Sequence, residues 1–78
     1  MPSASPPPDW VLVRRRAVGQ SIRSLRLHEN LTQEQVSLRS GVDRASLVRI
    51  EAGQQSPTVD TLIRIADAIG VPLADLVG

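Results

Sequence analysis

The sequence contains no cysteine and a single histidine, His28. Without thiols there is neither a disulfide framework nor a thiolate metal site, and one histidine cannot hold a metal without several carboxylate partners. The chain also has no run of about 18 apolar residues, and its start lacks the charged and apolar regions of a secretory signal. We therefore expect no metal, no cofactor and no membrane segment, and we expect a cytoplasmic protein.

Lysine is absent as well, so all nine basic residues are arginine, and the net charge is +1. This small charge is weak evidence for nucleic-acid binding, because the electrostatic footprint depends on where charges lie rather than on their sum. GC-rich codon usage would explain an arginine-only set. Selection of the planar guanidinium, which grips phosphate and guanine, would explain it too, and both explanations can hold at once.

A chain of 78 residues has room for one domain, which at this size buries only about 60% of its unfolded surface. Such a compact core leaves little room for an enzyme pocket. The sequence also has no Gly-rich phosphate cradle, no nucleophile elbow and no metal-ligand cluster. We therefore expect a protein that is not an enzyme, and no small-molecule ligand is evident.

The first eight residues differ in composition from the rest of the chain. Residues 1–8 hold four of the six prolines, together with two serines and an alanine. Such a segment can neither form a helix nor bury a core, which predicts a flexible or polyproline-like arm. The folded domain is expected over residues 9–78.

Apolar residues recur at roughly helical spacing after this arm. The pattern predicts a first helix that begins at Asp9, a plausible N-cap, and ends near His28 or Glu29, with Asn30 as a left-handed stop. His28 is expected to be solvated near this helix end.

Two features of the first helix have more than one interpretation. Trp10, the only aromatic residue, is expected to pack the helix start onto the core, and a dimer contact is the alternative. Arg14, Arg15 and Arg16 are consecutive, so they cannot all face one surface of a helix. A solvated face is the expected role, and the alternative is that one or two of them reach the backbone of a nucleic acid.

Capping signals predict the next two helices. Thr32 and Gln35 have the spacing of a capping box, which starts a short second helix that ends before Gly41. Because Gly41 can adopt positive φ at low cost, we expect a tight turn there. Asp43 is then placed to cap a third helix over residues 44–52.

The last part of the chain shows two further helices. Thr58 is a candidate cap for the fourth, with Asp60 in its first turn and a stripe of apolar residues up to Gly70. The stripe consists of Leu62, Ile65, Ala66 and Ile69. A last short helix follows Pro72. The sequence therefore predicts an all-α, compact five-helix bundle without strands.

Six motifs occur in register along the chain: IRSLR, LTQEQV, SGV, RIEAG, SPTVDTL and IADAIGV. Residues 33–52 are predicted to form a helix-turn-helix unit. Over residues 18–77 the chain resembles the phage repressor and Cro-like group, often called the XRE family. The resemblance implies a lambda-repressor-like bundle and a sequence-specific, DNA-binding transcriptional regulator that inserts helix 44–52 into the major groove of a double-stranded operator.

Four residues of the third helix are candidates for reading bases. With Leu47 and Ile50 turned inward, helical geometry leaves an outward face, and the resemblance puts base contacts at the same positions. These positions are Arg44, Ala45, Val48 and Arg49. An arginine can donate two hydrogen bonds to a guanine, worth roughly 1 to 3 kcal/mol of discrimination, so we expect guanine in the half-site.

Phosphate contacts are expected around the ends of two helices. The resemblance implies that Gln33 touches a phosphate, and the helix starts at Gln33 and Thr58 offer free N–H groups and partial positive charge. Three further polar residues are candidates, although a solvated role is open for each of them: Ser46, Gln55 and Ser56.

Three residues are expected to have structural roles rather than to contact DNA. Arg26 and Glu51 match a pair that forms an interhelical salt bridge in similar repressors, so the resemblance gives them a structural role. Ser37 stands where the family usually has alanine, and its hydroxyl can bond a carbonyl four residues earlier.

A homodimer on a palindromic operator is the expected working form, because one short helix contacts too few bases for useful specificity. Ile63 and Val77, outside the main apolar stripe, are the candidate dimer contacts. Restriction-modification controllers, antitoxins and small phage repressors have similar length and pattern. The alternative is a protein-interaction module of the same fold, antitoxin-like or partner-binding, with DNA binding secondary.

Overall fold

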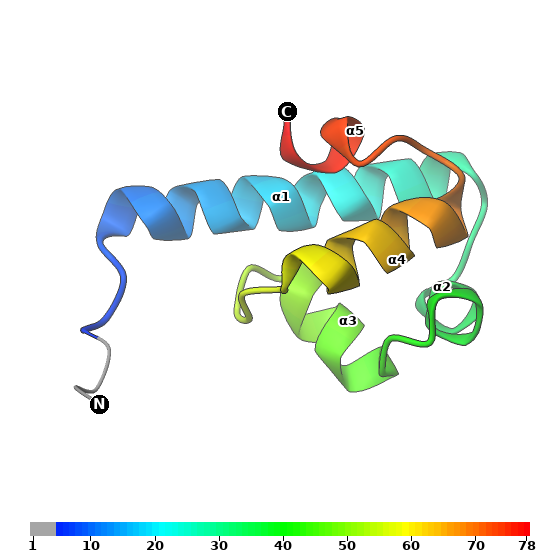
Figure 1. Ribbon diagram of the computed structural model, residues 1–78, viewed down its shortest axis with the longest axis horizontal. Helices are drawn as coiled ribbons and strands as arrows, with labels where there is room; N and C mark the ends of the chain where they lie inside the picture. The colour runs from blue at the N-terminus through cyan, green and yellow to red at the C-terminus, as the bar shows by residue number, and fades with distance from the viewer. Residues whose placement is uncertain (1–4) are drawn as a thin grey trace.

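The structure is a computed structural model, and its described residues are 5–78. Over these residues it is an all-α bundle of five helices, as predicted from the sequence (Figure 1). The helices are α1 (Asp9–His28), α2 (Gln33–Ser40), α3 (Arg44–Glu51), α4 (Val59–Ile69) and α5 (Ala74–Val77). Residues 5–8 of the expected arm have no regular structure, and residues 1–4 lie outside the described residues.

The long helix α1 is the element on which the others assemble. It contacts α3, α4 and α5, while α2 packs on α3 and α4. In Figure 1, α5 lies on one side of α1, and α4, α3 and α2 lie on the other. The first turns of α1 project beyond the rest of the bundle (Figure 1).

Three of the predicted N-caps are present in the structure. Thr32 and Gln35 form the capping box, with hydrogen bonds of 3.0 Å and 2.8 Å between their side chains and each other's backbone N–H. Asp43 accepts a hydrogen bond from the Ser46 N–H at 3.1 Å, and Thr58 caps α4. These local bonds explain why the starts of α2, α3 and α4 were predictable.

One cap was wrong. The N-cap position of α1 is Pro8, without a side-chain cap bond, and Asp9 is the first helical residue. Its carboxylate lies in the first turn, where its negative charge interacts favourably with the positive end of the helix dipole. At the other end of α1 the prediction is confirmed, because the helix ends at His28 and Asn30 has φ of 57°.

The core receives at least one fully buried side chain from every helix. Examples are Ile22 of α1, Val36 of α2, Ile65 of α4 and Leu76 of α5. The inward-facing pair of α3, Leu47 and Ile50, is buried to 0% and 1% exposure. A contiguous cluster of apolar side chains thus joins all five helices.

Trp10 does not anchor α1 to the core, because its side chain is 67% exposed. Trp10 is the second residue of α1, and the first turns of this helix project beyond the rest of the bundle (Figure 1). Ser37 also differs from expectation: its Oγ donates forward to the Val42 carbonyl at 2.6 Å, across the turn at Gly41, and not to a carbonyl four residues earlier. The hydroxyl therefore ties the end of α2 to the start of α3.

No helix within residues 5–78 is both long and apolar enough to cross a membrane.

Candidate DNA interface

The outer face of α3 is the surface on which the predicted base-reading residues gather. Arg44, Ala45, Val48 and Arg49 are all exposed. Since Leu47 and Ile50 of the same helix are buried, α3 has one face in the core and the other in solvent. Gly41, with φ of 73°, makes the tight turn that separates α2 from α3.

The end of α3 is held against the backbone of α1. A Cβ atom at Gly19 would lie 2.4 Å from the Ile50 carbonyl oxygen and 2.6 Å from that of Glu51. The two helices therefore approach more closely than any side chain at this position allows. At the other end of α3, Arg44 and Ala45 are exposed.

A buried ion pair adds a polar connection between the same helices. The guanidinium of Arg26 donates from Nε to Glu51 Oε2 at 2.8 Å and from Nη2 to Glu51 Oε1 at 2.9 Å. Both side chains are almost fully buried. Arg26 also donates to the Leu31 carbonyl at 2.8 Å, so the pair has additional hydrogen-bond partners.

Gln33 joins this network from α2. Its Nε2 donates to Glu51 Oε1 at 3.2 Å, and its side chain is half-buried. The first residue of α2 is thus connected through Glu51 to α3 and, by the ion pair, to α1. The sequence predicted a position for Gln33 at the helix start but not its bond to Glu51, because residues 18 positions apart show no common periodicity.

Arg49 contacts two of the residues for which we expected phosphate contacts. Its Nε donates to Gln55 Oε1 at 2.8 Å, and one terminal nitrogen lies 3.5 Å from Ser46 Oγ. The spacing of Ser46 and Arg49, three residues apart on one helix, is a signal that was available in the sequence. Gln55 follows the turn after α3, so nothing in the sequence pattern placed it beside Arg49.

The other phosphate candidates lie near the start of α4. Ser56 and Thr58 are exposed, and the Thr58 hydroxyl accepts from the Thr61 N–H at 3.0 Å and donates to Thr61 Oγ1 at 2.9 Å. Of the basic run on α1, Arg14 and Arg16 are exposed and Arg15 is half-buried. The three arginines therefore differ in exposure, as expected for consecutive residues of a helix.

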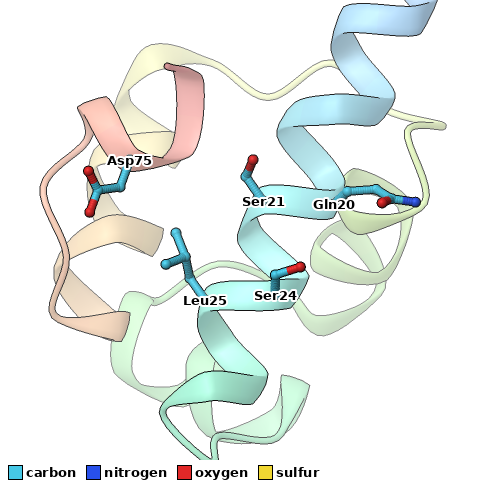
Figure 2. Close-up of a pocket in the computed structure, with 5 residues that line it drawn as sticks. All are labelled: Gln20, Ser21, Ser24, Leu25 and Asp75. Carbon is cyan, nitrogen blue, oxygen red and sulfur yellow. The ribbon is translucent and has the colours of Figure 1, made fainter.

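A hollow of about 510 Å³ lies elsewhere, between α1 and α5 (Figure 2). Its lining consists of Gln20, Ser21, Ser24, Leu25 and Asp75. The hollow is open to solvent, and its polar groups are a few neutral side chains and one carboxylate. We assign no function to it.

An exposed, capped helix that follows a second helix through a tight turn, on a small all-α bundle, is the architecture of a helix-turn-helix DNA-binding domain. Residues 22–76 match the model of the family described as "Helix-turn-helix", HTH_3. The chain belongs to this family, and it is a DNA-binding transcriptional regulator.

Curated relatives support this assignment. The chain is 43% identical to an uncharacterized HTH-type transcriptional regulator, y4dJ, of Sinorhizobium fredii, over 81% of this chain and 82% of that protein. It is 41% identical to the transcriptional repressor RstR of the cryptic phage CTXphi in Vibrio cholerae, over 72% of this chain but only 50% of the repressor. It is 32% identical to the control protein C.BamHI of Bacillus amyloliquefaciens, over 80% of this chain and 78% of that protein.

Solved structures with the same fold include two regulators. The restriction-modification controller protein C.AhdI from Aeromonas hydrophila superposes with a TM-score of 0.76 at 30% identity, covering 86% of this chain and 97% of the controller. An HTH_3 family transcriptional regulator from Vibrio cholerae gives 0.79 at 26% identity, covering 83% of this chain and 36% of the regulator.

Proposed function

We propose that the protein binds a palindromic operator as a homodimer and that each protomer places α3 in the major groove. The observation that carries this proposal is the division of α3 into a core face and an exposed face with two arginines. A helix about 10 to 12 Å across fits a major groove about 12 Å wide. The proposal requires no cofactor and no enzymatic step, and it places the site of action in the cytoplasm, where a bacterial operator lies.

Arg44 and Arg49 are the proposed guanine readers. Both are exposed on α3, and each guanidinium has enough donors for O6 and N7 of one guanine. A positive charge at Arg44 opposes the helix dipole, which favours a role outside the fold. Ala45 and Val48 present small apolar surfaces suited to contact with thymine methyl groups.

Gln33, Ser56 and Thr58 are the proposed phosphate contacts. Gln33 is the first residue of α2, and Thr58 is the cap of α4. Both helix starts offer backbone N–H groups and partial positive charge. This mode of binding explains how a chain with a net charge of only +1 can bind DNA.

The proposed dimer contact includes Ile63 of α4 and Val77 of α5. They are 49% and 52% exposed, so each leaves apolar surface that a second copy could cover. Around Ile63, Asp60, Arg64 and Asp67 are exposed as well. A two-fold axis near Ile63 would set this side chain against its counterpart in the second copy and cover both.

A partner-binding role is the second candidate, and the projecting start of α1 favours it. Trp10 and Val13 are 67% and 60% exposed there. An apolar surface of this kind is suited to another protein, such as a toxin or a polymerase subunit. On this alternative, DNA binding would be secondary.

Selection from a random pool of duplexes, at a stated salt concentration, tests the proposal. We expect an enriched inverted repeat with half-sites separated by about 10 base pairs or a multiple. Arg49→Ala is expected to relax the preference at one base pair, whereas Gln33→Ala weakens binding to all sequences about equally. Absence of any enriched motif would favour the partner-binding alternative.

A further inference from the structure

The hydrogen bond between Arg49 and Gln55 restricts a side chain that would otherwise be mobile. Arg49 is exposed on α3, and an exposed arginine has several rotatable bonds. Two acceptors surround it: Gln55 Oε1 at 2.8 Å from Nε, and Ser46 Oγ at 3.5 Å from a terminal nitrogen. Both acceptors come from the domain itself and are therefore present before DNA binds.

The position of Gln55 depends on the turn that ends α3. Gly53 has φ of 73°, and its N–H bonds the Ile50 carbonyl at 3.1 Å, while the Gln54 N–H bonds the Arg49 carbonyl at 2.8 Å. A Cβ at Gly53 would lie 2.5 Å from Cγ of Arg16, so this turn is packed against α1. The chain thus returns beside α3, and Gln55 is half-buried there.

The contact with Gln55 leaves the guanine-binding edge of Arg49 free. A guanidinium has five N–H donors in a planar fork. Nε donates to Gln55 and one terminal N–H is directed to Ser46. The remaining donors belong to the two terminal nitrogens, which can address O6 and N7 of a guanine in parallel.

We propose that Gln55 is a positioning residue that holds Arg49 ready for a guanine, and that it acts on base preference rather than on a phosphate. This inference rests on the function proposed above. It replaces the earlier expectation of a phosphate contact for Gln55. Its energetic basis is preorganisation, because ordering Arg49 in the free protein lowers the entropy lost when the base contact forms.

The test measures base preference with the same random duplex pool, for the wild type and five variants. Gln55→Ala is expected to lower the guanine preference at the Arg49-dependent position about 3- to 10-fold, the range of one hydrogen bond. Gln55→Glu keeps an acceptor oxygen, so it retains that preference while binding all duplexes more weakly. Arg49→Ala combined with Gln55→Ala loses no more preference than Arg49→Ala alone, because Gln55 acts through Arg49.

Gln54→Ala is the matched control, since Gln54 is an exposed glutamine in the same turn. It should leave the preference unchanged, and thermal unfolding of each variant checks that the domain is folded. A uniform loss of affinity in Gln55→Ala, with guanine preference intact, would assign Gln55 to a phosphate and overturn this inference while leaving the proposed function standing. If the wild type enriches no motif, both fail.

Discussion

At the scale of single residues, Glu51 connects α3 to two other helices through polar contacts. Its carboxylate accepts from Arg26 and Gln33, and the residue is only 7% exposed. A buried ion pair of this kind contributes little net stability when intact, but removing one partner leaves an uncompensated charge. Glu51 therefore supports α3 without being directed at the proposed DNA face.

We expect Glu51→Ala to lower the free energy of unfolding by about 3 to 5 kcal/mol, because it leaves the Arg26 guanidinium buried without its partner. A small domain has only about 5 to 15 kcal/mol in total, so the loss is large. Urea denaturation of the purified protein measures it. Glu34→Ala, on the exposed side of α2, is the control and should change stability by less than about 0.5 kcal/mol. A similarly small effect of Glu51→Ala would contradict the structural role.

Residues also differ in how well the sequence predicts their surroundings. The burial of Leu47 and Ile50 followed from helical periodicity and is confirmed. The predicted core contact of Trp10 was wrong. Periodicity shows which face of a helix is apolar, but it does not show how far the neighbouring helices extend. The bond between Arg49 and Gln55 was not predicted either, because it depends on the path of the chain after Gly53.

At the scale of the elements, the crossing of α1 and α3 is set by a glycine. In an ordinary helix interior, Gly→Ala stabilises by about 1 kcal/mol. At Gly19 the added methyl group would meet the Ile50 and Glu51 carbonyls at 2.4 Å and 2.6 Å. Backbone atoms cannot move away as easily as the end of a flexible side chain.

We therefore expect Gly19→Ala to destabilise the domain by about 1 to 3 kcal/mol, the usual cost of overpacking. Thermal or urea unfolding shows whether the free energy of unfolding falls or rises. Ala17→Gly, on the exposed side of the same helix, is the control and should destabilise by about 0.5 to 1 kcal/mol through backbone entropy alone. If Gly19→Ala stabilised the protein, the close approach of the two helices would be refuted.

The cap of α3 allows stability and DNA binding to be separated. Asp43 accepts from the Ser46 N–H, and its negative charge lies at the start of the proposed recognition helix. Asp43→Asn keeps an acceptor for the cap, so unfolding should change by less than about 0.5 kcal/mol. Removing the negative charge near phosphates should raise affinity for all duplexes roughly 2- to 5-fold.

Asp43→Ala is the comparison, because it removes both the charge and the cap. It should lower stability by about 1 kcal/mol. Fluorescence anisotropy with labelled duplexes and urea denaturation give the two readouts. Weaker binding by Asp43→Asn would show that this end of α3 does not approach the DNA backbone.

At the scale of the whole molecule, the proposed homodimer depends on apolar surface that the single chain does not cover. We expect Ile63→Asp to raise the dimer dissociation constant about 100-fold or more, because a two-fold interface would bury two unpaired charges. Sedimentation equilibrium measures this change. Leu38→Asp on α2, where leucine is 78% exposed, is the control and should leave the oligomeric state unchanged. A dimer that survives Ile63→Asp would place the interface elsewhere, with Trp10 as the next position to test.

Local signals in the sequence predicted the five helices and most of their ends. The caps at Thr32, Asp43 and Thr58, and the left-handed residues Asn30 and Gly41, act through bonds and dihedral angles within about four residues. Such signals are local and can be recognised in the chain. The family resemblance over residues 18–77 added the fold and the class of function, which the helix-turn-helix family match supports.

The side-chain contacts across the bundle, in contrast, could be learned only from the three-dimensional arrangement of the helices. It brought Gln33 to Glu51, the Ser37 hydroxyl to the Val42 carbonyl, and Gln55 to Arg49, and it left Trp10 in solvent. These contacts depend on how closely the helices pack and where each one ends in space. The physical reason is that such packing is set by all the elements together, so no local stretch of sequence specifies it.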